Sequence, residues 1–222
     1  MSLPSRGVVY VAYGKNARDQ AMLSAQSLRK QHPEMPFRVL SDRSFPRVYR
    51  FPDMPVIHHR DTDPGARGVK LNVDKLSPFD HTLYLDADTR VQGDITMPFD
   101  LLDNGWEMCI VPCRRQADNA HSHVNTDERE TTFEEVGDGL LALQGGVIWF
   151  RRCEAVHRLF AAWREEWARW EDQDQAALVR ALVTNPVRVF LLNRQYNGGR
   201  IVRHFYKYAR RPGMDGAASK MI

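Results

Sequence analysis

The sequence predicts an α/β fold in which a mainly parallel, Rossmann-like central sheet is flanked by helices. Short apolar, β-rich runs alternate with a segment of helical periodicity, two aspartates stand where one apolar run stops, and a strongly amphipathic helix follows in the second half. A length of 222 residues with 43% hydrophobic residues suits one domain with a closed core. We find no internal repeat and no low-complexity segment.

The first half of the chain supplies the alternation of strands and helices. Residues 7 to 13 form an apolar run that stops at Gly14, and residues 19 to 28 carry apolar side chains at helical spacing. Two further β-rich runs cover residues 37 to 40 and 55 to 57. A helix that connects two strands places them side by side and parallel.

Two aspartates mark a candidate ligand site. A short helix predicted over residues 70 to 76 precedes an apolar strand over 82 to 85, and the strand stops at Asp86 and Asp88. In open α/β sheets, ligands bind beyond the carboxyl ends of the strands. Residues i and i+2 of an extended segment point the same way, so both carboxylates can face one cation. Such hard oxygen ligands suit Mg²⁺ or Mn²⁺, whose open positions a diphosphate can fill.

The second half begins with a polar stretch. Residues 114 to 139 show no sustained period, which predicts a mobile excursion, and His121 and His123 are interpreted as part of a solvated loop because nothing nearby completes a ligand set. Regular secondary structure is expected again from residue 140. The predicted elements are an apolar segment at 140 to 150, helices at 154 to 170 and 174 to 182, and a strand at 187 to 192. The tryptophans there, Trp149, Trp163, Trp167 and Trp170, are interpreted as packing residues.

Composition narrows the class of protein and its location. A formal net charge of +3 argues against nucleic acid as a partner. The three cysteines have no paired spacing, which argues against a disulfide framework or a structural zinc site and favours a reducing cytosol. Residues 1 to 6 lack the features of a leader, and no stretch approaches the roughly 20 apolar residues of a membrane span. The basic tail at 203 to 211 is compatible with peripheral contact to an anionic membrane, with a solvated role, or with a role at a diphosphate.

Several segments, in the same order, resemble family 8 glycosyltransferases, the family of glycogenin and of bacterial lipopolysaccharide galactosyltransferases. The segments are Lys70-Leu71, Leu76-Ser-Pro-Phe-Asp80, Tyr84-Leu-Asp-Ala-Asp-Thr-Arg-Val91, Gln144-Gly-Gly-Val147, Asp174-Gln-Ala-Ala-Leu178 and His204-Phe205. The resemblance covers most of the chain except residues 92 to 139. It implies a GT-A nucleotide-diphospho-sugar transferase fold over residues 1 to 222, with a nucleotide-binding half at 1 to 91 and an acceptor and catalytic half at 92 to 222.

The resemblance also implies an activity and a set of site residues. The activity is transfer of a hexose, with retention, from a nucleotide-sugar donor such as UDP-hexose to a saccharide, lipid-linked or protein acceptor. The implied metal ligands for Mn²⁺ (or Mg²⁺) are Asp86, Asp88 and His204. The implied donor-binding residues are Ala12, Tyr13 and Asn16 at the base, Lys70, Lys207 and Arg210 near the diphosphate, and Gln144, Gly145 and Gly146 in the Gln-Gly-Gly turn. Gln175 would lie beneath the anomeric carbon, and Asp174 would contact sugar hydroxyls.

The chain departs from the family pattern at three positions. Lys207 stands where the family commonly has glycine, which puts a close backbone approach to phosphate in doubt. Arg210 takes the position of a lysine, and arginine can still contact a diphosphate. Gly145 replaces a serine and removes a hydroxyl that could have contacted the sugar.

Three other functions compete with this interpretation. A haloacid-dehalogenase-type phosphatase would use Asp86 as nucleophile, but its aspartate loop normally ends the first strand of the domain. A nucleotidyltransferase would need a Gly-rich loop after the first strand, where only Gly14 and Lys15 are present. A non-catalytic nucleotide-sugar-binding protein could keep the aspartates without turnover.

Overall fold

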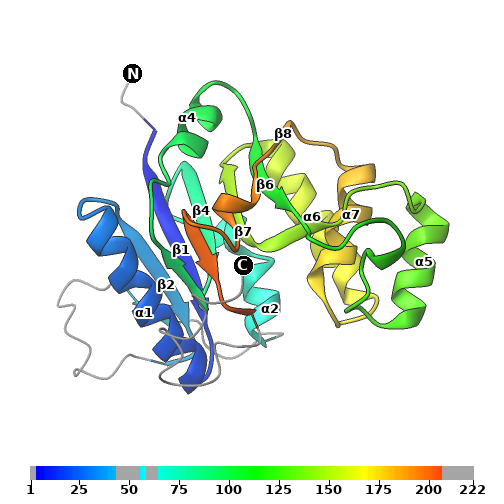
Figure 1. The fold of residues 1–222 in the computed structure, drawn as a ribbon, viewed down its shortest axis with the longest axis horizontal. Helices are drawn as coiled ribbons and strands as arrows, with labels where there is room; N and C mark the ends of the chain where they lie inside the picture. The colour runs from blue at the N-terminus through cyan, green and yellow to red at the C-terminus, as the bar shows by residue number, and fades with distance from the viewer. Residues whose placement is uncertain (1–3, 44–55, 59–64, 207–222) are drawn as a thin grey trace.

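The computed structural model describes residues 4–43, 56–58 and 65–206 (Figure 1). Within these residues, seven strands form one sheet in the order β3-β2-β1-β4-β7-β6-β8. The strands are β1 (Arg6–Ala12), β2 (Phe37–Ser41), β3 (Val56–His58), β4 (His81–Asp86), β6 (Met108–Pro112), β7 (Leu143–Arg151) and β8 (Val189–Leu191). The strands predicted from the apolar runs at 7–13, 37–40, 55–57, 82–85 and 187–192 are all present.

Most strand pairs in the sheet are parallel, which confirms the predicted fold class. β3, β2, β1 and β4 run parallel to their neighbours, and β8 runs parallel to β6. β7 is the exception, because it lies antiparallel between β4 and β6. The register pairs Val11 of β1 with Asp86 of β4, so the carboxyl ends of these two strands meet at one edge.

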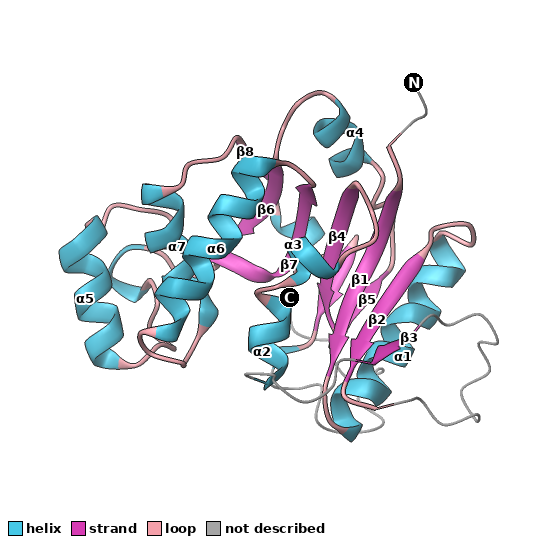
Figure 2. Cartoon of the chain, turned by 180° about the vertical axis from the view of Figure 1, so that it is seen from behind, coloured by secondary structure: helices cyan, strands magenta, loops and turns pink. Residues whose placement is uncertain are grey.

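Helices cover both faces of the sheet, and the alternation of side chains along β1 shows how. Val8 and Tyr10 point into one apolar cluster, which includes buried residues of α1 (Lys15–Gln31). Val9 and Val11 point into a second cluster, which includes buried residues of α6 (Glu154–Ala168). Views from opposite sides place α1 on one face and α6 on the other (Figures 1 and 2). A strand buried on both faces is expected to be apolar along its buried length, as β1 is from Gly7 to Ala12.

Further elements complete the described fold. They are α2 (Gly65–Lys70), α3 (Val73–Leu76), α4 (Met97–Asp103), α5 (Thr126–Val136), α7 (Asp174–Thr184) and the short 3₁₀ helices η1 (Ala117–Asn119) and η2 (Arg194–Tyr196). A separate antiparallel pair joins β5 (Thr89–Val91) to β9 (Val202–His204). The single helix predicted over 70–76 is therefore two short helices, and α4, β5, β6 and β9 were not predicted.

The prediction of a mobile excursion over 114–139 is wrong, because this stretch contains η1 and α5. α5 is attached to α7 through Arg180, a buried arginine that donates to Thr132 Oγ1 and, at 3.1 Å, to Glu128 Oε1. His121 is only 3% exposed, so the interpretation of a solvated loop is wrong for this residue. Burial, with cationic neighbours including Arg180, lowers the pKa of His121 to about 4.

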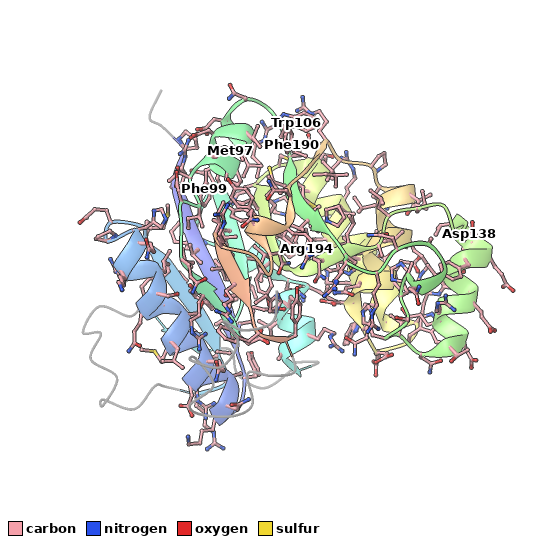
Figure 3. The ribbon with its side chains drawn as sticks, viewed as in Figure 1. Met97, Phe99, Trp106, Asp138, Phe190 and Arg194 are labelled. Atoms are coloured by element: carbon pink, nitrogen blue, oxygen red, sulfur yellow. The ribbon has the colours of Figure 1, made fainter. Side chains whose placement is uncertain are left out.

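The tryptophans act as packing residues, as predicted for Trp149, Trp163 and Trp167, all of which are buried. Trp106 and Phe190 pack edge to face with ring centroids 5.2 Å apart, and this contact anchors the edge strand β8 (Figure 3). Among the helices in the described residues, none is both long enough and apolar enough to cross a membrane.

Candidate metal centre and donor site

The end of β4 presents the two predicted aspartates in a fixed turn. Asp86 is the last residue of β4, and Asp88 lies in the turn before β5. Thr89 Oγ1 donates a hydrogen bond to the Asp86 carbonyl at 2.8 Å and lies 3.0 Å from the hydroxyl of Ser24 on α1. These bonds tie the turn to the neighbouring helix, so the carboxylates are held on ordered backbone.

A second strand brings the histidine to the aspartates. β9 pairs with β5 in a register that sets His204 opposite Thr89, and the next amide, of Phe205, donates to the carbonyl of Asp88 at 3.0 Å. His204 Nε2 lies 3.1 Å from Asp88 Oδ1 and 3.7 Å from Asp86 Oδ2. The structure thus brings together the three metal ligands that the resemblance implied.

The three side chains fit a divalent cation. Their ligand atoms all lie within 4.8 Å of one another, and no other group of three such residues is found in the described part of the chain. Gly146 leaves room beside them, because a Cβ there would collide with Asp86 Oδ2 and His204 Cε1. Two carboxylates with one imidazole suit a hard to borderline ion such as Mn²⁺, and Mg²⁺ prefers oxygen ligands alone.

Tyr84 is a neighbour of the aspartates that the sequence reasoning missed. It lies two residues before Asp86 in β4, and its hydroxyl donates to Asp86 Oδ1 at 2.6 Å. Burial, together with the negative charge of Asp86, raises the pKa of Tyr84, so the hydroxyl keeps its proton at neutral pH. The i, i+2 spacing along a strand was a signal that could have identified it.

A buried ion pair lies next to the aspartates. Lys70, at the end of α2, contacts Asp174 at the start of α7, and its Nζ is 3.8 Å from Asp86 Oδ1. Burial alone would lower the pKa of Lys70, but Asp174 and Asp86 outweigh it and raise the pKa. For Asp174, burial is outweighed by the charge of Lys70, and the pKa is lowered. Both groups are therefore charged at neutral pH.

Gln144, Gly145 and Gly146 lie within strand β7, beside both the ion pair and the aspartates, so the turn that the resemblance implied here is wrong. Gln144 is half-buried in β7, and both glycines after it are buried. A Cβ on Gly145 would lie 3.2 Å from Lys70 Nζ and 3.5 Å from Asp174 Oδ2. Gly145 therefore borders the ion pair, and Gly146 borders the aspartates and His204.

Gln175 follows Asp174 and is half-buried. Its amide has two neighbours that the sequence reasoning did not assign to the site: Cys113, whose Sγ is 4.0 Å from Gln175 Oε1, and His123, whose ring is hydrogen-bonded to the amide. Burial raises the pKa of Cys113 to about 12, so the thiol is neutral. Both residues come from the stretch after β6, whose polar sequence gave no signal that it packs on α7.

The residues predicted to meet the base lie at the same edge of the sheet. Ala12 is the buried last residue of β1, and its carbonyl accepts from Ser41 Oγ at 2.8 Å. Tyr13 packs against the second apolar cluster, and Asn16 is exposed in α1. The predicted diphosphate residues Lys207 and Arg210 lie outside the described residues.

Comparisons with known proteins identify the fold. No protein-family model and no curated protein sequence matches the chain. The galactosyltransferase LgtC, in complex with donor and acceptor sugar analogs, is similar in structure with a TM-score of 0.60 and 15% identity over 86% of this chain and 74% of LgtC. An active-site Gln-to-Glu variant of LgtC gives 0.60 and 16% over 93% and 92% of the two chains. Mouse xyloside xylosyltransferase 1, in its apo form, gives 0.58 and 14% over 86% of each chain. The chain thus has the GT-A fold that the resemblance implied.

Proposed function

We propose that the chain is a metal-dependent glycosyltransferase that transfers a hexose from a nucleotide-sugar donor, a UDP-hexose, to an acceptor with retention of configuration. The observation that carries the proposal is the convergence of Asp86, Asp88 and His204 at the carboxyl edge of a GT-A sheet, next to Lys70 and Asp174. A ligand site at this edge is where open α/β sheets bind nucleotides.

The charge distribution supports a diphosphate as the ligand. A divalent cation held by Asp86, Asp88 and His204 would supply the positive charge that the leaving nucleoside diphosphate needs. Lys70 stays protonated beside Asp86 and adds a second positive charge on the protein side. We prefer Mn²⁺ to Mg²⁺ because the set includes an imidazole.

The remaining residues are assigned roles around the donor. Asp174, held by Lys70, would accept hydrogen bonds from sugar hydroxyls, and Gln175 would face the anomeric carbon. An amide is a poor nucleophile, so we favour attack on the same face through a short-lived ion pair. The other assignments are Ala12, Tyr13 and Asn16 at the base, Gln144, Gly145 and Gly146 beside the diphosphate and sugar, and Lys207 and Arg210 at the diphosphate.

The two halves of the chain would bind different substrates. We assign nucleotide binding to residues 1–91 and the acceptor to residues 92–222, within one domain. The acceptor is a saccharide, a lipid-linked sugar or a protein. We assign the enzyme to the cytoplasm, and a lipid-linked acceptor would be reached through peripheral contact of the basic tail with an anionic membrane.

The fold weighs against the phosphatase alternative. The haloacid-dehalogenase loop normally ends the first strand of its domain, whereas Asp86 ends β4, after three earlier strands. A nucleotidyltransferase would need a Gly-rich loop after β1, and the sequence there offers only Gly14 before Lys15.

Calorimetry on the purified chain tests the proposal. UDP, GDP and p-nitrophenyl phosphate are titrated with Mn²⁺ and again with chelator. We expect UDP to bind in Mn²⁺ and to lose that binding in chelator. Hydrolysis of p-nitrophenyl phosphate in Mg²⁺ without nucleotide binding would favour the phosphatase. Turnover of UDP-hexose, measured as release of UDP, separates an enzyme from a binding protein.

A further inference from the structure

His204 is in contact with polar groups through both of its ring nitrogens. Nε2 faces the carboxylates of Asp88 and Asp86. Nδ1 lies 2.8 Å from Oδ1 of Asn197. An amide oxygen can only accept a hydrogen bond, so Nδ1 must carry the proton in this arrangement. The carboxylate oxygens that face Nε2 also only accept, so without a cation Nε2 is the donor to Asp88; a cation bound there would replace that hydrogen and take the Nε2 lone pair, while Nδ1 keeps its hydrogen on Asn197.

Asn197 is well placed to hold the ring because it is itself held by the fold. The residue is only 3% exposed, and its backbone N–H donates to the carbonyl of Arg194 at 3.2 Å. The preceding residue, Tyr196, is buried and packs edge to face on Trp149 at a centroid distance of 5.6 Å. The next residue, Gly198, has φ +92° and donates to the carbonyl of Val202, which starts β9. The segment is therefore anchored in the core on one side and in the β5–β9 ladder on the other.

One face of the His204 ring is also restrained. Tyr206 stacks on it with a centroid distance of 4.1 Å and an interplanar angle of 17°. Stacking opposes tilting of the ring but does not select between the two tautomers, because it acts on the ring face. Asn197 contacts Nδ1 only. Among the residues that the structure describes on the side of the ring away from the carboxylates, it is therefore the contact that favours a hydrogen on Nδ1.

We propose that Asn197 is a positioning residue for the metal centre: by accepting the Nδ1 hydrogen of His204, it fixes the tautomer and the ring angle that direct Nε2 to the cation. The inference rests on the proposed function, because it assumes that His204 is a metal ligand. Histidine ligands commonly donate their second ring N–H to a fixed acceptor, and loss of that acceptor weakens metal affinity by about 10-fold to 100-fold. An amide provides this acceptor without adding a third negative charge to the two aspartates.

The first test measures Mn²⁺ affinity without nucleotide or sugar, by electron paramagnetic resonance of the free ion. The variants are Asn197→Ala, which removes the acceptor, and Asn197→Asp, which keeps it. The matched control is Asn193→Ala. Asn193 is exposed at the other end of η2, and its side chain accepts from the amide of Gln195 at 2.9 Å. Its removal therefore disturbs the same segment without touching His204.

We expect Asn197→Ala to weaken Mn²⁺ binding by about 10-fold to 100-fold and the Asn197→Asp variant to restore most of the affinity. Asn193→Ala should bind Mn²⁺ as the unaltered chain does. Equal affinity of Asn197→Ala and the unaltered chain would overturn the positioning role and leave the proposed function standing. If the unaltered chain itself binds no Mn²⁺, the proposed metal site fails and the positioning role of Asn197 fails with it, which differs from the result in which only the Asn197→Ala variant is unaffected.

The second test needs no metal. The ring nitrogens of His204 are assigned by ¹⁵N nuclear magnetic resonance of the unaltered chain. We expect a hydrogen on Nδ1 that is hydrogen-bonded to Asn197, and we expect this hydrogen bond to be lost in Asn197→Ala. A ring that carries its hydrogen on Nε2 alone in the unaltered chain would overturn the inference, even if the alanine variant did not fold.

Discussion

The side chains next to Gly145 and those next to Gly146, two neighbouring residues of β7, differ in how their charges are balanced. On the Gly145 side, the positive Lys70 and the negative Asp174 neutralise each other. On the Gly146 side, Asp86 and Asp88 face a histidine, and Lys70 is the nearest lysine at 3.8 Å from Asp86. The buried pair of Lys70 and Asp174 is thus balanced in charge, whereas the partly exposed Asp86 and Asp88 carry more negative charge than their single contact with Lys70 offsets. The difference explains why a cation, in the proposed function, would bind next to Gly146 and not next to Gly145.

The largest effect on stability is expected from a substitution that breaks the ion pair of Lys70 and Asp174. Lys70→Met leaves Asp174 buried without its cation, and loss of one partner of a buried pair costs about 3–5 kcal/mol of unfolding free energy. Urea unfolding measures this cost. Lys75→Met, at an exposed lysine of α3, is the control and should change the free energy by less than about 0.5 kcal/mol. The double variant Lys70→Met, Asp174→Leu should be more stable than Lys70→Met alone; equal stability would argue against charge as the cause.

The group of Asp86, Asp88 and His204 should make the stability of the chain depend on metal. At a concentration 100 times the dissociation constant, Mn²⁺ should raise the unfolding free energy by about 2.7 kcal/mol, and chelator should remove the gain. Asp88→Asn should abolish this gain and the Mn²⁺-dependent binding of UDP, while the metal-free variant stays folded. The readout is the thermal midpoint with and without Mn²⁺. An equal shift of the midpoint in Asp88→Asn would contradict the assignment of Asp88 as a ligand.

A methyl group at Gly146 should disturb the aspartates and His204 through steric collision. The Cβ of Gly146→Ala would collide with Asp86 Oδ2 and His204 Cε1, so we expect a loss of about 1–3 kcal/mol of stability together with loss of Mn²⁺ binding. Denaturant unfolding and a Mn²⁺ titration measure the two effects. Retained Mn²⁺ affinity would show that the ligands do not lie as close to this glycine as the structure has them.

The same methyl group at Gly145 should have the smallest effect. There the Cβ would lie 3.2 Å from Lys70 Nζ, the end of a flexible side chain that can shift by a few tenths of an ångström. We expect Gly145→Ala to cost less than about 1 kcal/mol and to leave Mn²⁺ affinity unchanged. The same two measurements apply. A loss of metal binding as large as that of Gly146→Ala would remove the distinction between the two sides.

Sequence patterns predicted the elements whose buried faces are apolar. β1, β2, β4 and α6 were all expected from their apolar runs or periodicity, and the aspartates were placed correctly at the end of β4. α5 was missed because its buried residues are Glu128 and Thr132, which bind the buried Arg180. Hydrophobic periodicity cannot find a helix that packs through polar groups.

Asn125 offered a local signal for α5 that went unused. Its side chain accepts from the amide of Asp127 at 2.9 Å, as an N-cap asparagine does. For the site, His204 was reached only through the family resemblance, because its partners lie far away in sequence. Asn197 could not be found from the sequence at all, since the role of an amide depends on which ring nitrogen it meets.

The pairing of β5 with β9 has a consequence for the order of events during synthesis. Asp88 and His204 are 116 positions apart. At about 5–20 residues per second, a ribosome adds His204 on the order of 10 s after Asp88. The parallel strands β1, β2 and β4 can form before that, but the three-ligand centre cannot. Uptake of a cation would therefore begin only once β9 has emerged and paired, and a nascent chain that stops before β9 would carry the two carboxylates without the third ligand.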